Sequence, residues 1–267
     1  MSVITKKSGE LQYLQAEGIS VPHCFTTRLG GVSTGSLSSL NIGTSRGDSR
    51  ENVLKNYEIL GSALGFDIHD LVLSRQVHSD IVHVVRQEDR GAGLFAEHLP
   101  DCDALVTDVK GLALVVFTAD CTPILFYDPV TGAVGAAHAG WRGTAQAIAA
   151  KTVEAMAENF GSRPQDLCCA IGPNIGMCHF ETNEDVPQAM RAAFGPEVEA
   201  YIAHKGQKYY LDLKQINAMV LRRAGVRNIE ISDACTMCQS QVFWSHRITG
   251  NDRGSQGAVI VCREGAK

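Results

Sequence analysis

The feature that most constrains the fold is a series of short apolar runs that recurs along almost the whole chain. Such runs, bounded by polar or turn-forming residues, are typical of β-strands. They are too numerous for one simple parallel sheet, so we expect two packed sheets. The expected strands are Leu11–Leu14, His23–Thr26, Leu71–Leu73, Ile81–Val85, Ala104–Val106, Leu112–Phe117, Ile124–Phe126, Ala133–Ala137, Leu167–Ile171, Lys208–Leu211, Ile229–Ile231 and Ala258–Cys262.

Helical patterns are fewer and lie between these runs. Each has apolar residues on one face, and three begin at a residue that can cap a helix. Many strands with few helices favour an α+β domain over residues 1–267, with mixed sheets flanked by helices. The expected helices run from the cap Ser49 to Leu64, from the cap Thr144 to Phe160, through Val186, Met190 and Phe194, and from the cap Asp212 to Ala224.

The composition is that of an ordinary globular protein and excludes some function classes. Hydrophobic residues make up 45% of the 267 residues, charged residues 20%, and the net charge is −5, which gives no general attraction to nucleic acid or to a membrane surface. No apolar run approaches the ~20 residues of a spanning helix. The first residues contain no apolar segment of a secretory signal, so we expect a cytoplasmic protein with reduced thiols.

Two histidines and one cysteine lie at or just after predicted strand ends. His138 follows the run 133–137, Cys121 follows the run 112–117, and His78 follows the run 71–73. Each alone is more often structural than functional. Together they form a ligand set that suits zinc with a fourth position left open. Loops that follow strand ends commonly form functional sites, which makes a shared site for the three residues more favourable.

The remaining cysteines give a weaker signal. Cys235 and Cys238 have the spacing of half a zinc ribbon or of a redox motif. The chain has no second Cys-x-x-Cys, which makes a structural zinc ribbon an unfavourable interpretation. Cys178 lies in a turn-rich loop where it could line a site.

Arginines in glycine-rich loops are candidates for binding an anion, because the guanidinium fork matches phosphate. Neither a Walker A motif nor a Gly-x-Gly-x-x-Gly fingerprint is present, which argues against nucleoside triphosphate or dinucleotide enzymes. The candidate substrate- and phosphate-binding residues are Arg28, Asn41, Arg46, Arg247 and Arg253.

Taken together, the motifs resemble the laccase-domain family, which has been described both as multicopper polyphenol oxidoreductase and as zinc-dependent purine nucleoside phosphorylase. The resemblance covers nearly the whole chain. The motifs that carry it are Thr27 to Ser33, Ser39 to Gly43, Gln76-Val77-His78, Asp103-Ala104-Leu105, Ala119 to Pro123, Ala137 to Gly143, Ile171-Gly172-Pro173 and Cys235-Thr236.

The resemblance implies a layered α/β/β/α domain and a metal held by His78, Cys121 and His138. It implies zinc, with copper as the alternative, and phosphate as co-substrate. The implied reaction is phosphorolysis of adenosine, inosine and 5′-methylthioadenosine, with adenosine deamination at the same site. Cys121 and His138 would be catalytic, and Asp120 would orient a histidine, move protons or cap a turn. The loops around Ser79, His246 and Asp252 depart from the family pattern, which bears on substrate preference.

Three alternatives stay open. A copper-dependent polyphenol oxidase needs several clustered histidines, and this chain has nine in all and no His-x-His pair. A metal-free thiol hydrolase would use Cys121 as nucleophile and His138 as base, oriented by Asp120 or Asn174. A zinc-stabilised binding module would show no turnover.

The partners expected are a purine nucleoside and phosphate, with no nucleic acid or membrane, and the sequence leaves the oligomeric state open.

Overall fold

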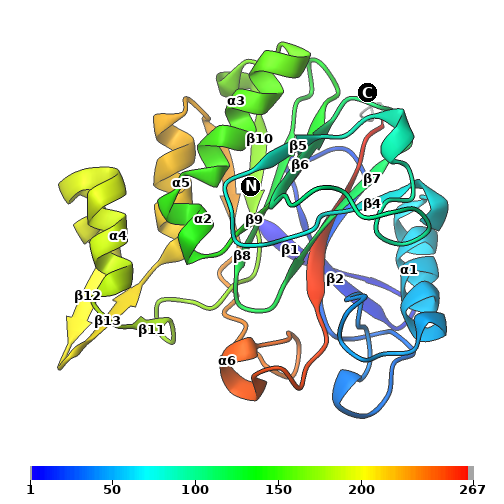
Figure 1. Ribbon diagram of the computed structural model, residues 1–267, viewed down its shortest axis with the longest axis horizontal. Coiled ribbons are helices and arrows are strands. Elements are labelled where there is room, and N and C mark those ends of the chain that lie inside the picture. The colour runs from blue at the N-terminus through cyan, green and yellow to red at the C-terminus, as the bar shows by residue number, and fades with distance from the viewer. Residues whose placement is uncertain (1, 264–267) are drawn as a thin grey trace.

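The computed structural model describes residues 2–263 and shows two six-stranded sheets packed face to face, with helices on both outer faces (Figure 1). The first sheet has the order β1 (Val3–Ser8), β2 (Leu11–Ala16), β3 (His23–Thr26), β15 (Gln256–Val261), β7 (Ala113–Thr118) and β4 (Leu71–Leu73). The second has the order β14 (Asn228–Ile231), β10 (Cys168–Ile171), β8 (Thr122–Tyr127), β9 (Val134–Ala139), β6 (Ala104–Thr107) and β5 (Val82–Val84).

Both sheets are mixed. The pairs β4–β7, β5–β6 and β10–β14 are parallel, and the other pairs are antiparallel. Central strands such as β8 and β9 are buried along their whole length, because the other sheet covers one face and helices cover the other. This explains why they read as continuous apolar runs without alternation. A third, small sheet has the order β11 (Glu181–Thr182), β13 (Lys208–Leu211) and β12 (Ile202–Lys205).

The helices divide between the two outer faces (Figure 1). α1 (Arg50–Leu64) packs on the first sheet, in the cluster that contains Tyr57 and Val115. The second sheet is covered by α2 (Trp141–Ala145), α3 (Ile148–Phe160) and α5 (Leu213–Arg223). α4 (Asp185–Phe194) lies farther out, against α2 and the small third sheet (Figure 1). The short α6 (His246–Thr249) precedes β15. Short 3₁₀ helices occupy Gly35–Leu37, Ile68–Asp70, Gln87–Asp89, Pro164–Asp166 and Gly195–Tyr201. No helix of residues 2–263 has both the length and the apolar character that crossing a bilayer requires.

The predicted layers and all of the predicted strands are confirmed, and so are the caps Ser49 and Asp212. The prediction of one helix from Thr144 to Phe160 is wrong. Ala147 adopts φ +58, in the left-handed region, and separates α2 from α3. Nothing in an alanine signals such a break. The short elements β1, β11, β12 and α6 were also not predicted.

Candidate metal centre

The three predicted ligands come together where both sheets end. Cys121 lies in the turn between β7 and β8, His138 lies in β9, and His78 lies in the loop after β4. One nitrogen or sulfur atom of each residue lies within 4.8 Å of those of the other two. The two imidazole rings meet edge to face, with their centroids 4.9 Å apart.

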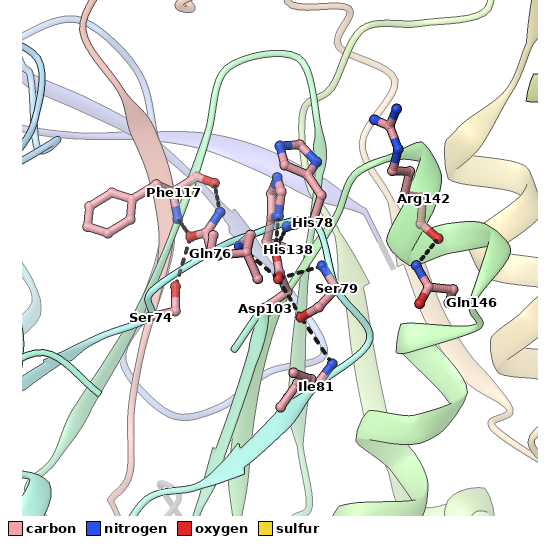
Figure 2. A network of polar contacts seen from close by, with 11 residues as sticks. Ser74, Gln76, His78, Ser79, Ile81, Asp103, Phe117, His138, Arg142 and Gln146 are labelled. Atoms are coloured by element: carbon pink, nitrogen blue, oxygen red, sulfur yellow. Dashed lines mark hydrogen bonds and ion pairs between the residues drawn. The ribbon is translucent and has the colours of Figure 1, made fainter. Parts of the chain in front are cut away.

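Asp103 is the side chain that organises this cluster (Figure 2). It is fully buried, and its Oδ1 accepts a hydrogen bond from Nδ1 of His138 at 2.8 Å. The carboxylate also accepts the backbone N–H groups of Val77, His78 and Ser79 at 3.1, 3.1 and 2.7 Å, and the Ser79 hydroxyl at 2.7 Å. Because Nδ1 of His138 faces Asp103, Nε2 is the nitrogen left for a metal ion. One carboxylate thus orients both histidines.

The backbone around the cluster is specialised for this arrangement. His78 has φ +61, a value that non-glycine residues rarely adopt, and its N–H bond to Asp103 supports it there. Gly140, just after β9, lies against two of the ligands. A Cβ atom at Gly140 would lie 2.6 Å from Nδ1 of His78 and 3.3 Å from Sγ of Cys121. Only glycine therefore lets the chain pass so close to the cluster.

The charges around His138 favour a cation. Burial lowers the pKa of this imidazole, but the negative charges of Cys121 and Asp103 outweigh burial and raise the pKa to about 9. The pKa of Asp103 falls to about 2, because hydrogen bonds from His138 and Ser79 outweigh the opposing effect of burial. Burial, with the charge of His138, lowers the pKa of His78. His78 therefore offers a neutral nitrogen lone pair, and the sulfur and carboxylate stabilise positive charge beside it.

The donor set fits a metal ion. Zinc takes imidazole nitrogen and thiolate sulfur, and catalytic zinc sites use three protein ligands and keep one position open. Copper accepts the same ligands, so the donor set fits either metal. The Asp103 carboxylate behind His138 is the partner that metal-binding histidines usually have.

The carboxylate of Asp120, which was expected to orient a histidine, move protons or cap a turn, is bonded to other residues than the two histidines in the described chain. The hydrogen bonds of its side chain in the described chain come from residues 236–247, and Asp103 is the carboxylate that accepts the hydrogen bond of His138. Asp120 has φ +87, so it also forms the sharp turn that leads into Cys121. Its side chain accepts hydrogen bonds from the Thr236 hydroxyl at 2.6 Å, the Arg247 N–H at 2.7 Å and the Ser245 hydroxyl at 3.1 Å.

A cavity of about 530 Å³ opens beside the cluster. His78, Cys121 and His138 line it together with two of the predicted anion-binding residues, Arg46 and Arg253. The volume is within the range of small-molecule sites. The cavity therefore combines a cluster of metal-ligand type with positive charge.

The two arginines are held by neutral partners, so their charges remain available. Arg46 donates to the Ser255 hydroxyl at 3.3 Å, and Arg253 donates to the carbonyl of Gly254 at 2.9 Å. Burial, and then the charge of Arg46, lower the pKa of Arg253 to about 10. An anion between the guanidinium groups would remove this repulsion and accept their hydrogen bonds.

The other three predicted substrate residues do not line this cavity. Arg28 stacks on the Trp244 ring at 3.8 Å. Arg247 donates to the carbonyl of His179 at 3.2 Å. Asn41 is fully buried, and its side-chain oxygen accepts hydrogen bonds from the backbone N–H groups of Gly43 and of Ser255, which directly precedes β15. These three residues support loops around the cavity.

Sequence reasoning missed several residues of the site. Asp103 lies directly before β6, in the sequence Asp103-Ala104-Leu105, and an acidic residue next to a fully buried strand is a signal that could have identified it. Gln76 accepts the N–H of Phe117 at 2.6 Å and donates to its carbonyl at 2.8 Å, which ties the His78 loop to β7 (Figure 2). The other cavity residues not predicted include Arg50, Arg75 and His98.

Comparisons with known proteins show the family of this chain. A model of the family described as multi-copper polyphenol oxidoreductase laccase matches residues 22–263. The purine nucleoside phosphorylase YlmD of Geobacillus stearothermophilus is 40% identical over 241 residues, which cover 88% of this chain and 87% of that protein. A purine nucleoside phosphorylase of Deinococcus radiodurans is 40% identical over 250 residues, which cover 94% and 92%.

A solved structure of a relative has the same fold. The crystal structure of YlmD from Geobacillus stearothermophilus has a TM-score of 0.91 and 36% identity to this chain, and the match covers 98% of this chain and 100% of that one. Both the family match and these relatives span nearly the whole molecule. The chain therefore belongs to the laccase-like polyphenol oxidoreductase family, whose relatives include proteins named purine nucleoside phosphorylase.

Proposed function

We propose that this protein is a metal-dependent purine nucleoside phosphorylase, with phosphate as co-substrate. The observation that carries the proposal is one shared cavity, in which His78, Cys121 and His138 face the same space as Arg46 and Arg253. Relatives that are named purine nucleoside phosphorylase support it.

In this reaction a phosphate oxygen forms a bond to C1′ of the ribose while the bond from C1′ to the purine nitrogen breaks. The purine leaves with the electron pair and takes up a proton. Arg46 and Arg253 would bind and position the phosphate, which converts a bimolecular attack into an oriented one. A zinc ion held by His78, Cys121 and His138 would supply a Lewis acid that stabilises developing negative charge.

The substrates that we propose are adenosine, inosine and 5′-methylthioadenosine. We also propose adenosine deamination at the same site, because metal-activated water is known chemistry for attack at C6 of adenine. In both reactions Asp103 would keep His138 oriented, since its carboxylate accepts a hydrogen bond from Nδ1 of His138 at 2.8 Å.

The direct test is product analysis with inosine, in the presence and absence of phosphate. The proposal predicts hypoxanthine and ribose 1-phosphate only when phosphate is present, and loss of both after chelation. Free ribose in place of ribose 1-phosphate would contradict it. Arg46→Met and Arg253→Met should raise the KM for phosphate about tenfold or more, because each removes one charged contact. Arg163→Met, whose guanidinium pairs with Asp166 on the surface, is the matched control.

A second candidate is oxidation of phenols, because the matched family carries that description. It requires copper. Copper-loaded protein that consumes oxygen with a phenol, while zinc-loaded protein leaves inosine intact, would favour this candidate over phosphorolysis.

A third candidate is thiol hydrolysis without metal, and one observation favours it. Asp103, His138 and Cys121 form the carboxylate–imidazole–sulfur series of a thiol nucleophile. Asp103 thus replaces Asp120 and Asn174 as the orienting residue. Ester or amide hydrolysis that survives chelation and is lost in Cys121→Ser would support it.

A further inference from the structure

A second cluster of metal-ligand type lies outside the cavity. Cys178 and His179 belong to the loop between β10 and β11, and Cys235 and Cys238 belong to the segment after β14. One ligand atom of each residue lies within 4.8 Å of those of the other three. None of the four lines the cavity of the first cluster. Two segments far apart in the sequence therefore bring three sulfurs and one imidazole to one place.

The distances in this cluster match a tetrahedron. Sγ of Cys178 lies 3.7 Å from Sγ of Cys238. Nδ1 of His179 lies 3.2, 3.7 and 3.4 Å from the sulfurs of Cys178, Cys235 and Cys238. In tetrahedral zinc, with Zn–S of about 2.3 Å and Zn–N of about 2.0 Å, sulfurs lie about 3.8 Å apart and sulfur lies about 3.5 Å from nitrogen. The four atoms thus already stand near the corners of a zinc coordination shell.

The surrounding backbone supports ligation by sulfur. The N–H of Gly176 donates to Sγ of Cys235 at 3.2 Å, a contact that stabilises a thiolate. A Cβ atom at Gly176 would lie 3.3 Å from Sγ of Cys178 and 3.2 Å from Cβ of Cys235, so this loop packs tightly against the two cysteines. A disulfide would account for two of the three sulfurs, but not for the position of the third sulfur and of His179 beside them.

We propose that Cys178, His179, Cys235 and Cys238 bind a second zinc ion, which is structural. Four protein ligands close the coordination shell, which is typical of structural sites. The absence of a second Cys-x-x-Cys argued against such a site. The structure supplies the missing pair as adjacent Cys178 and His179.

The position of the cluster shows what this ion would stabilise. Thr236, next to Cys235, donates its hydroxyl hydrogen to Asp120 at 2.6 Å, and its N–H donates to the carbonyl of Asn174 at 2.9 Å. The N–H of Ile175 donates to the carbonyl of Asp120 at 2.9 Å. Both zinc-linked segments thus contact the residue that precedes Cys121. The second ion would hold the turn that presents Cys121 to the first cluster.

The test is the zinc content of the full chain, purified with and without added zinc, by elemental analysis. The proposal predicts about two zinc ions per chain, and about one in the double variant Cys178→Ser, Cys238→Ser. His78→Ala should also retain about one. Cys168→Ser, which changes a thiol outside both clusters, is the matched control and should retain both. Chelation should lower the Tm of His78→Ala, in which only the second cluster is intact, and should leave the combined His78→Ala, Cys178→Ser, Cys238→Ser variant unchanged.

Three results would overturn the proposal. The first is zinc content that is the same in the wild type and in the double variant. The second is a Cys178–Cys238 disulfide in freshly purified wild-type protein, detected by mass spectrometry. The third is a His78→Ala protein that folds and holds no zinc. If the double variant fails to fold, Cys238→His decides, because it replaces one zinc ligand by another and should retain the second ion. Each readout is independent of nucleoside turnover, so the proposed function can fail while this proposal stands.

Discussion

Replacement of Asp103 by asparagine tests how the first metal cluster is built. The change removes a charge and few atoms, so any effect comes from hydrogen bonding. In the structure five donors point at this carboxylate: three backbone N–H groups, the Ser79 hydroxyl and Nδ1 of His138. Asparagine offers one oxygen and turns an NH₂ group toward the rest. At least two of the five contacts are therefore lost, whichever way the amide is oriented.

The expected magnitude follows from those contacts. A hydrogen bond to a charged group contributes about 1.5–3 kcal/mol, so two lost contacts should lower the free energy of unfolding by about 3–6 kcal/mol. Loss of the carboxylate behind a metal-binding histidine typically weakens metal affinity about 10–100-fold. Asp103→Asn should therefore bind zinc at the first cluster about 10–100-fold less tightly than the wild type.

Two assays measure these effects. Urea unfolding of metal-free protein gives the stability change, and competition with a chromophoric chelator gives the zinc affinity. The affinity is measured in the Cys178→Ser, Cys238→Ser background, which leaves only the first cluster to titrate. Asp101→Asn is the matched control: this carboxylate is half exposed and pairs with Arg75 at the surface, so its loss should cost less than about 1 kcal/mol. Wild-type zinc affinity and stability in Asp103→Asn would refute the reasoning.

Three further predictions follow from single positions. Gly140→Ala should abolish zinc binding at the first cluster in a chelator competition, because its Cβ would lie 2.6 Å from Nδ1 of His78; an unchanged affinity would contradict the close approach. Ala147→Gly should raise the free energy of unfolding by up to about 1 kcal/mol, because φ +58 strains alanine, whereas Ala150→Gly within α3 should lower it by about 1 kcal/mol. In metal-free protein the pKa of Asp103 falls from 3.8 to about 2 on folding, so its contribution is complete above about pH 4 and is lost as the pH falls toward 2. The stability difference between wild type and Asp103→Asn should therefore shrink by on the order of 2 kcal/mol in acid, and a constant difference in urea titrations would count against this assignment.

Patterns that report burial and capping were enough to predict most of the fold. Strands such as β8 and β9 are buried on both faces, so their sequences are continuously apolar. The cap of α1 is Ser49, whose side chain accepts the N–H of Asn52 as its position predicts. β1 was missed because most of its residues are exposed and polar, and it lies at the edge of its sheet, where it pairs with β2. That residues 1–267 form one domain stays a prediction.

The site was predictable only in part, for a physical reason. His78, Cys121 and His138 could be singled out because strand ends bring such residues together. Arginines in similar glycine-rich loops cannot be told apart in this way. Arg46 faces the cavity while Arg28 stacks on Trp244. Which of these arginines reaches the cavity depends on tertiary packing, not on the local sequence. The second cluster was missed because it joins two loops that no sequence spacing connects.

The proposed phosphorolysis requires one metal ion at His78, Cys121 and His138, with its open side toward Arg46 and Arg253. Anomalous diffraction at the zinc edge, from crystals of the full chain grown with zinc and soaked in phosphate, tests this directly. The expected result is a peak within coordination distance of the two histidine nitrogens and the Cys121 sulfur, with phosphate density between that peak and the two guanidinium groups. A map with no peak among these three residues, or with phosphate bound away from both arginines, would contradict the account.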